Sequence, residues 1–322
     1  MRVLITGITG FVGSYMAEHA LSQGAEVFGT SRGQSTAENI EHLRGRITLI
    51  QCDLRDDASV RSLVARSGPD YVVHLAAQSI VGTSWHAPAE TLANNILSQV
   101  SLLEAIRPLA VPPRFLCVGS SEEYGMVYEE ELPIRETNPL RPLSPYAVSK
   151  VTQDLMGYQY FKSYGLPIVR ARAFSHEGPR RGDVFMTSNF AKQVAEIEAG
   201  WREPVVRVGD LKPRRDFSDV RDVVRGYWLL LEHGAPGEVY NLCSGRSWSI
   251  QQVLEFLIGA STVKGIAVEV DPDRLRPSDV MILEGDPSKI EKATGWKVAI
   301  PFERTLSELL DYWRERVRPA AR

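Results

Sequence analysis

Three glycines near the start of the chain constrain its fold more than any other feature. The stretch "LITGITGFVG" places Gly7, Gly10 and Gly13 in a G-x-x-G-x-x-G array directly after the apolar run Val3–Ile5. Such an array between a strand and a helix lets the chain turn tightly, bring its backbone close to a ligand, and pack the helix against the strand. The array therefore predicts a strand–turn–helix unit whose helix N-terminus faces a diphosphate.

The first half of the chain continues as alternating strands and helices. Further strands are predicted at Glu26–Phe28, Thr48–Gln51, Tyr71–Leu75, Phe115–Val118 and Ile168–Ala171, and helices at Val12–Gln23, Leu92–Ile106 and Pro145–Ser163. This alternation predicts an α/β fold, a doubly wound parallel sheet of the Rossmann type with helices on both faces. Beyond about residue 172 the alternation loosens into Gly- and Pro-rich loops of the kind that line a binding cleft.

Composition argues against several classes of function. The net charge of −3 and the lack of a long Lys/Arg run argue against nucleic acid as a partner. Cys52, Cys117 and Cys243 lie in apolar segments without C-x-x-C spacing, so we expect no metal site and no disulfide framework. No apolar run reaches the length of a membrane span, and no signal-peptide pattern opens the sequence. We therefore expect a soluble, cytoplasmic protein without membrane association.

The residues at the end of the second strand select between the two nicotinamide dinucleotides. An acid there would hold the ribose hydroxyls of NAD(H) and repel a 2′-phosphate. The sequence "VFGTSRG" has no acid, but Ser31 and Arg32 offer a hydroxyl and a guanidinium that can bind a 2′-phosphate. NADP(H) is therefore favoured, with NAD(H) as the alternative in which Arg32 is a solvated loop residue. Asp53, after the third strand, is placed to accept from an adenine amino group.

Small and apolar residues complete the expected cofactor site. The stretch "HLAAQS" supplies two alanines where a strand end can pass beside the cofactor. The expected cofactor contacts are Gly7, Thr9, Gly10, Phe11, Val12, Gly13, Ser31, Arg32, Asp53, Leu54, Leu75, Ala76, Ala77, Tyr146 and Lys150.

The heptapeptide "SPYAVSK" predicts a helix that carries chemistry. Ser144 is a good N-cap and Pro145 a good first helical residue, so Tyr146 and Lys150 fall at i and i+4 on one face. An ammonium beside a phenol favours the phenolate, so Lys150 would make Tyr146 a proton donor and acceptor near neutral pH. On its own the pattern is more often an amphipathic helix with a half-buried tyrosine and a lysine that reaches into solvent.

The segment "RFLCVGSSEEYG" predicts a buried strand that ends in hydroxyls and carboxylates. Ser120, Ser121 and Glu122 follow the apolar run directly. Strands often end in polar residues because they end at the surface. In an open parallel sheet, however, the carboxyl ends of the strands form the ligand crevice, so the same residues are candidates for catalytic groups at that edge of the sheet.

A Y-x-x-x-K motif downstream of the glycine array, with a strand ending in serine between them, resembles the extended short-chain dehydrogenase/reductase family over essentially the whole chain. The resemblance implies a triad of Ser120, Tyr146 and Lys150 acting at C4 of a sugar, and helices that pair between subunits of a homodimer or homotetramer. The implied Rossmann-type cofactor domain covers 1–172 together with 217–243. The implied smaller α/β nucleotide-sugar-binding domain covers 173–216 together with 244–322.

Within that family the chain is most similar to reductases that form GDP-6-deoxy-D-mannose (GDP-D-rhamnose), through "VGSSEEYG", "RPLSPYAVSK", "RRDFSDVRDVV" and "VYNLCSG". "SHEGPRRG" is closer to the GDP-mannose 4,6-dehydratases, which carry Asn at the Ser175 position. The resemblance implies NADP(H)-dependent reduction of the C4 ketone of a GDP-4-keto-6-deoxyhexose. The alternatives are a dehydratase with tightly bound NADP, a nucleotide-sugar epimerase, and a non-catalytic NADP-binding protein. The presence of Tyr146 and Lys150 argues against the last of these.

The choice between reductase and dehydratase depends on one carboxylate. A dehydratase needs a base for the proton on sugar C5, and Glu122 stands two residues after Ser120, on the same face if the strand continues. A reductase needs only the triad, and the likeness of the whole chain favours it. The implied substrate contacts are Gln78, Ser84, Ser121, Ser175, Asn189, Arg215, Arg276 and Asp279.

Overall fold

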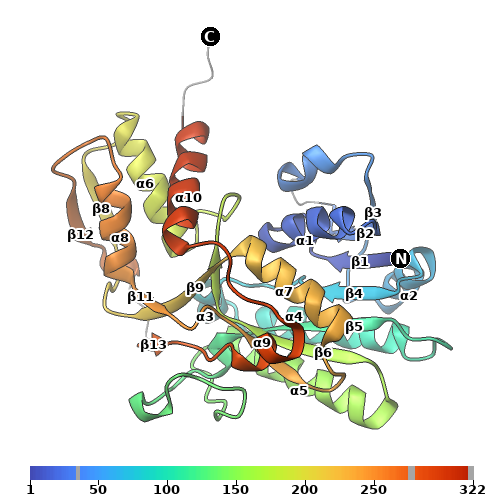
Figure 1. Cartoon of the computed structure of the whole chain (residues 1–322). Helices are drawn as coiled ribbons and strands as arrows, with labels where there is room; N and C mark the ends of the chain where they lie inside the picture. The colour runs from blue at the N-terminus through green and yellow to red at the C-terminus, as the bar shows by residue number, and fades with distance from the viewer. Residues whose placement is uncertain (34–36, 275–279, 318–322) are drawn as a thin grey trace.

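A seven-stranded parallel sheet forms the centre of the larger part of the molecule in the computed structural model, which describes residues 1–33, 37–274 and 280–317 (Figure 1). In pairing order its strands are β10 (Val239–Leu242), β6 (Ile168–Ala173), β5 (Arg114–Ser120), β4 (Tyr71–His74), β1 (Arg2–Thr6), β2 (Glu26–Ser31) and β3 (Ile47–Gln51). The order reverses at β1, which pairs with β2 on one side and β4 on the other, and a ligand crevice opens at such a point. The predicted doubly wound parallel sheet is confirmed.

Helices cover both faces of this sheet. One face carries α1 (Phe11–Ser22), α7 (Val220–His233) and α9 (Ser288–Thr294), and the other α2 (Asp57–Ser67), α4 (Pro88–Ile106) and α5 (Pro145–Tyr164). Val3 and Ile5 belong to one apolar cluster and Leu4 to the other, all three fully buried. The three central residues of the first strand are therefore all apolar, because both faces of the strand are covered there. Short elements connect these units: η1 (Glu38–Leu43), α3 (Val81–His86), η2 (Ser121–Glu123) and η3 (Glu129–Glu131).

The smaller part consists of short strands and three amphipathic helices, at the left of Figure 1. β9 (Arg214–Asp219) pairs with β7 (Ser175–Glu177), β11 (Ser247–Ser249) and β13 (Ile282–Leu283), while β8 (Val205–Val208) pairs with β12 (Ala267–Val270). α6 (Met186–Glu198), α8 (Ile250–Gly259) and α10 (Phe302–Arg316) pack around a third apolar cluster, and η4 (Pro272–Arg274) follows β12.

Local signals place the helix that bears the Y-x-x-x-K motif. The Ser144 side chain accepts from the backbone nitrogen of Ala147 at 3.1 Å, and Pro145 is the first residue of α5. Gly165, with a φ of 69°, ends the helix in the left-handed conformation that glycine adopts most easily. The predicted start of α5 is therefore confirmed, and its end lies one residue beyond the predicted Ser163; the start determines the positions of Tyr146 and Lys150.

Two of the differences from the sequence prediction concern α2 and α9. The pattern does not predict α2, although Asp56 caps it by accepting from the backbone nitrogens of Ala58 and Ser59. The segment with α9 and Trp296, expected in the smaller part, packs instead against α7, where the Trp296 indole nitrogen donates to the Asp222 carbonyl at 2.9 Å. Of the helices in the described residues, none is long and apolar enough to cross a membrane.

Candidate active site

A cavity of about 1400 Å³ lies where the C-terminal ends of the sheet strands meet the smaller part. The glycine loop and the ends of β4 and β5 form one wall, and the loop after β7 with the start of α6 forms the other. The predicted site residues that line it are Gly7, Thr9, Gly10, Phe11, Val12, Gly13, Ser31, Arg32, Asp53, Leu54, Leu75, Ala76, Ala77, Ser120, Ser121, Glu122, Tyr146, Lys150, Ser175, Asn189 and Arg215. The fold thus brings together candidates that are up to two hundred residues apart in the sequence.

The glycine array forms the turn between β1 and α1. Gly7 has a φ of 71°, and a Cβ at Gly13 would lie 2.2 Å from the Gly7 carbonyl oxygen, so both positions require glycine. Thr6 Oγ1 accepts from the backbone nitrogens of Leu75 and Ala76, each at 3.1 Å, and so holds the loops after β1 and β4 together. This backbone-lined space at the N-terminus of α1 fits the diphosphate of a dinucleotide.

Ser31, Arg32 and Asp53 line another stretch of the cavity, at the ends of β2 and β3. Hydrogen bonds from Arg55 lower the pKa of the Asp53 carboxyl, and the charge of Arg32 adds to this effect. Both Asp53 oxygens accept from Arg55, at 3.0 and 3.1 Å, so the expected contact with an adenine amino group has to share them. Asn39, which sequence reasoning missed, also lines this region.

Ser120, Tyr146 and Lys150 meet where β5 ends against the start of α5. Ser120 is the last residue of β5, and its Oγ accepts from the Glu122 backbone nitrogen at 3.2 Å. Tyr146 and Lys150 are 9% and 5% exposed, and the Tyr146 hydroxyl interacts with the Ser120 side chain. Three groups able to move or stabilise a proton therefore share one nearly dry corner of the cavity.

Burial dominates the electrostatics of this corner. It raises the pKa of Tyr146 well above its usual value, against a smaller lowering by the hydrogen bond with Ser120. Burial also lowers the pKa of Lys150, whose Nζ donates to the Val118 carbonyl at 2.9 Å and lies 6.0 Å from the centre of the Tyr146 ring. The prediction that Lys150 makes Tyr146 more acidic is therefore wrong for this structure, because the ammonium faces the backbone of β5 and loss of solvent outweighs its charge.

The two carboxylates after Ser120 have different environments. The chain turns into η2 directly after Ser120, so the argument that Glu122 shares a strand face with Ser120 is wrong, although half-buried Glu122 still lines the cavity. Glu123 is fully buried instead, and its Oε1 accepts from the Ser120 backbone nitrogen at 2.7 Å. Glu122 is thus accessible to a ligand, whereas Glu123 holds the serine in place.

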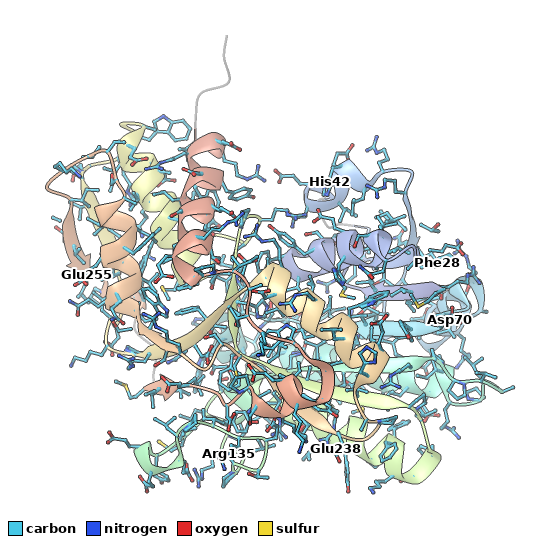
Figure 2. The ribbon with its side chains drawn as sticks, viewed as in Figure 1. Phe28, His42, Asp70, Arg135, Glu238 and Glu255 are labelled. Carbon is cyan, nitrogen blue, oxygen red and sulfur yellow. The ribbon has the colours of Figure 1, made fainter. Side chains whose placement is uncertain are left out.

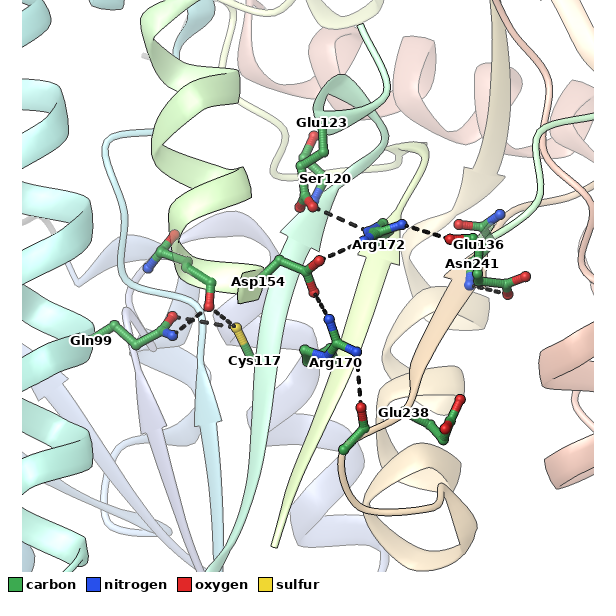
Figure 3. A network of polar contacts seen from close by, with 12 residues as sticks. Gln99, Cys117, Ser120, Glu123, Glu136, Asp154, Arg170, Arg172, Glu238 and Asn241 are labelled. Atoms are coloured by element: carbon green, nitrogen blue, oxygen red, sulfur yellow. Dashed lines mark hydrogen bonds and ion pairs between the residues drawn. The ribbon is translucent and has the colours of Figure 1, made fainter. Parts of the chain in front are cut away.

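Glu123 belongs to a buried network of carboxyl and guanidinium groups beneath this corner of the cavity (Figure 3). Its Oε2 lies 3.2 Å from Nε of Arg172 on β6, and Arg172 also donates to Asp154 of α5 at 2.5 Å. The other oxygen of Asp154 accepts from Arg170 at 3.1 Å. Because Glu123 lies in η2, the short helix that follows β5, and Asp154 lies on α5, the network links the two elements that carry the candidate catalytic groups. Sequence reasoning missed this network.

The loop "SHEGPRRGD" crosses from the smaller part onto the start of the larger one. Arg180 lies 3.6 Å above the Tyr15 ring and donates to Glu18 of α1 at 2.7 Å. His42 on η1, labelled in Figure 2, contacts the same carboxylate. Arg181, which follows, lines the cavity and lies 3.5 Å from the centre of the Phe185 ring. Neither arginine was among the predicted site residues, although two consecutive arginines after a Gly-Pro pair were a visible signal.

Several predicted substrate contacts lie on the wall formed by the smaller part. Ser175 and Asn189 line the cavity there, and the Asn189 side chain donates to the Asp183 carbonyl at 3.0 Å. Arg215 lines it too, although its Nη1 also donates to the Val280 carbonyl at 2.6 Å. Arg274, a cavity residue that sequence reasoning missed, donates to Asn189 at 2.8 Å.

Two of the remaining predicted contacts, Arg276 and Asp279, lie outside the described residues. The other two, Gln78 and Ser84, are not among the described residues that line the cavity. The Gln78 amide is engaged with Ile80, donating to its carbonyl at 3.1 Å and accepting from its nitrogen at 2.5 Å. Ser84 is fully buried, and its hydroxyl donates within α3 to the Val81 carbonyl at 2.7 Å. The Gln78 and Ser84 side chains therefore stabilise the segment around α3.

Comparison with known proteins agrees with this geometry. The family profile described as GDP-mannose 4,6 dehydratase matches residues 4–309. A GDP-6-deoxy-D-mannose reductase of Pseudomonas aeruginosa is 32% identical over 98% of both chains, and a GDP-mannose 4,6-dehydratase of Vibrio cholerae is 33% identical over 95% of this chain and 92% of its own. The solved structure of RMD from Pseudomonas aeruginosa, complexed with NADPH, superposes with a TM-score of 0.83 at 30% identity, covering 98% of this chain and all of that one. The chain therefore belongs to the GDP-mannose 4,6-dehydratase family of nucleotide-sugar enzymes.

Proposed function

We propose that the protein is an NADP(H)-dependent oxidoreductase that reduces the C4 ketone of a GDP-4-keto-6-deoxyhexose to GDP-6-deoxy-D-mannose. The observation that carries the proposal is the meeting of Ser120, Tyr146 and Lys150 with the glycine loop in a single cavity. The full-length similarity to a GDP-6-deoxy-D-mannose reductase supports the same assignment.

The triad residues have distinct roles in this reaction. NADPH, when bound, supplies the hydride for C4. Tyr146 donates its proton to the C4 oxygen, because a phenol is protonated at neutral pH and its hydroxyl lies in the cavity beside Ser120. Ser120 donates a hydrogen bond to the same oxygen and stabilises the negative charge that develops there. Lys150 holds the end of β5, next to Ser120, through its hydrogen bond to the Val118 carbonyl.

The two ligands divide between the two parts of the molecule. We assign the cofactor to 1–172 with 217–243, where the glycine loop takes the diphosphate and Ser31 with Arg32 takes the 2′-phosphate. We assign the GDP-hexose to the wall formed by 173–216 and 244–322, apart from the α9 segment. The nucleotide contacts we propose there are Ser175, Asn189, Arg215, Arg276 and Asp279. Ser121, which follows β5 on the opposite wall of the cavity, is a further proposed contact.

A second candidate reaction is 4,6-dehydration of GDP-mannose. Glu122 lines the cavity two residues from Ser120, and its charge raises the pKa of Tyr146, so a carboxylate base lies near the reacting carbons. Dehydration would use the cofactor without net consumption, because the hydride that leaves C4 returns to C6. The two reactions therefore differ in their need for external reductant.

A product assay separates these functions. The purified protein is given the GDP-4-keto-6-deoxyhexose with NADPH, and separately GDP-mannose without reductant, with nucleotide-sugars separated by chromatography. We expect NADPH consumption matched by GDP-6-deoxy-D-mannose in the first reaction and no conversion in the second. Formation of the 4-keto sugar from GDP-mannose without reductant would favour the dehydratase, and a change of stereochemistry alone would favour an epimerase.

A conservative variant tests the role of Glu122. Glu122→Gln keeps the shape and removes the base, so it should retain NADPH-dependent reduction within about tenfold, whereas a dehydratase would lose about 10² or more of its rate. Glu130→Gln, an exposed carboxylate of η3 away from the cavity, is the matched control.

We also propose that two copies of the chain pair through α4 and α5. Leu97 of α4 is 48% exposed, and Val148, Leu155 and Tyr158 of α5 are 41%, 52% and 42% exposed, although the two helices pack side by side. Apolar side chains on two neighbouring helices gain stability when a second copy covers them. A homodimer satisfies this surface, and a homotetramer requires a further interface.

A further inference from the structure

Tyr227, in the middle of α7, has a buried hydroxyl that the reaction described above does not use. Its side chain is fully buried, and its hydroxyl has no hydrogen-bond partner among the described residues. A buried hydroxyl without a partner destabilises a protein, so such a group in a native fold calls for a partner that arrives with a ligand. Tyr227 is also one of the residues that border the cavity.

The position of Tyr227 decides which ligand it faces. It packs in the same apolar cluster as Ala173, Leu75 and Val118, which line the cavity at the ends of β6, β4 and β5. Phe11, at the start of α1, packs against this cluster too. These residues belong to the cofactor half of the cavity, whereas the substrate wall is formed by the smaller part. A ligand atom near Tyr227 therefore belongs to the dinucleotide.

A second observation places Tyr227 at the catalytic end of the cofactor half. Burial raises the pKa of the Tyr227 phenol well above its usual value, and the charge of Tyr146 adds to the rise, so the two phenols lie within electrostatic reach. The part of the dinucleotide that must reach the catalytic end is the nicotinamide, because hydride passes between its ring and C4.

We propose that the Tyr227 hydroxyl is a binding determinant for the carboxamide of the nicotinamide ring. A carboxamide offers a carbonyl acceptor and an amino donor, and a phenol can both donate and accept, so the two groups are complementary. The hydrogen bond fixes the rotation of the ring, and with it the face from which hydride leaves. Tyr227 is thus a positioning residue that acts through the cofactor, and this role rests on the proposed use of NADP(H).

The test is Tyr227→Phe, with binding measured by isothermal titration of two ligands. NADPH carries the carboxamide, whereas adenosine 2′,5′-bisphosphate carries only the adenosine end. Loss of one hydrogen bond should raise the Kd for NADPH by about 3- to 10-fold and leave the Kd for the bisphosphate unchanged within about twofold. The melting temperature of the ligand-free variant should be unchanged or higher, because the variant loses a hydroxyl that has no protein partner.

Tyr240→Phe is the matched control. Tyr240 is also buried, but its hydroxyl accepts from the Ala235 backbone nitrogen at 3.0 Å, and it does not line the cavity. This variant should lower the melting temperature of the ligand-free protein, by about 2 to 4 °C, and leave both dissociation constants unchanged.

Three results would overturn the inference. An unchanged Kd for NADPH in Tyr227→Phe would show that the Tyr227 hydroxyl does not bind the carboxamide, and it would leave the proposed function unaffected. An equal weakening of both ligands, with a lower melting temperature, would mean that the hydroxyl supports the fold alone. Failure of the wild-type protein to bind NADPH at all would refute the proposed function, and this inference with it.

Discussion

Replacing Glu123 by glutamine should make the stability of the protein less dependent on pH. Glu123 is fully buried beside Asp154 and Arg172, and its Oε1 accepts from the Ser120 backbone nitrogen at 2.7 Å. Burial, followed by the charge of Asp154, raises the pKa of the Glu123 carboxyl from its ordinary 4.5 to about 8, against the lowering effect of Arg172. The carboxyl therefore binds a proton in the folded state over a pH range in which the unfolded chain has released it.

The sign and size of the effect follow from this difference. Because the folded-state pKa is raised, the stabilisation is complete below the unfolded pKa and is lost as pH rises through the folded pKa. Between about pH 5.5 and about pH 8.5, a shift from 4.5 to about 8 costs the wild type about 3 kcal/mol of unfolding free energy. Glutamine does not titrate, so the variant does not lose this contribution.

Urea denaturation at the two pH values measures the effect. The free energy of the variant minus that of the wild type should rise by about 3 kcal/mol from the lower to the higher pH. Any pH-independent change in the free energy of unfolding cancels in this comparison, including the cost of placing the new amide nitrogen against another donor. Glu131→Gln is the control, because Arg141 lowers the pKa of Glu131 to about 2 and its charge does not change in this range. A pH-independent difference for Glu123→Gln would mean that Arg172 keeps the carboxylate ionised throughout, and would refute the argument.

Three further predictions concern the site and the assembly. Tyr146→Phe should slow C4 reduction by about 10² to 10⁴ without changing the circular dichroism spectrum, because it removes only the proton donor; near-normal turnover would mean that another group donates. Arg32→Asp should shift the cofactor preference from NADPH toward NADH, because an acid repels the 2′-phosphate. Titration with both cofactors measures the preference, and an unchanged preference would mean that Arg32 is only a solvated loop residue. Leu155→Lys should reduce the mass measured by light scattering at micromolar concentration to that of a monomer; a wild type that is already monomeric would exclude the proposed pairing.

Features that depend on neighbouring residues could be predicted from the sequence. The turn at Gly7 needs a positive φ and Gly13 has no room for a Cβ, so the glycine array specifies its own geometry. The start of α5 depends on a capping hydroxyl and on Pro145, both adjacent to the helix, and this start places Tyr146 and Lys150 on one face. The parallel sheet followed from the alternation of apolar runs and helical patterns, because each strand must be covered on both faces.

What only the tertiary structure decided is where the polar groups of these elements point. Spacing predicted that Lys150 would act on Tyr146, but in the fold its ammonium donates to the Val118 carbonyl of a neighbouring strand. Nothing in the sequence distinguishes Glu122 from its neighbour Glu123. In the fold, the turn into η2 places the Glu122 side chain at the cavity and buries the Glu123 side chain.

Distance along the chain explains the remaining differences. Arg172 and Tyr227 lie far in sequence from Ser120 and from the glycine loop, and no local pattern relates them to either. Burial changes the energy of a charge or hydroxyl more than any neighbour in sequence does, and burial is a property of the assembled fold. The sequence by itself therefore determined the glycine turn, the start of the motif-bearing helix and the parallel sheet. The packing of distant segments determined which other groups line the cavity, and it determined the charge, the partners and the direction of the polar groups.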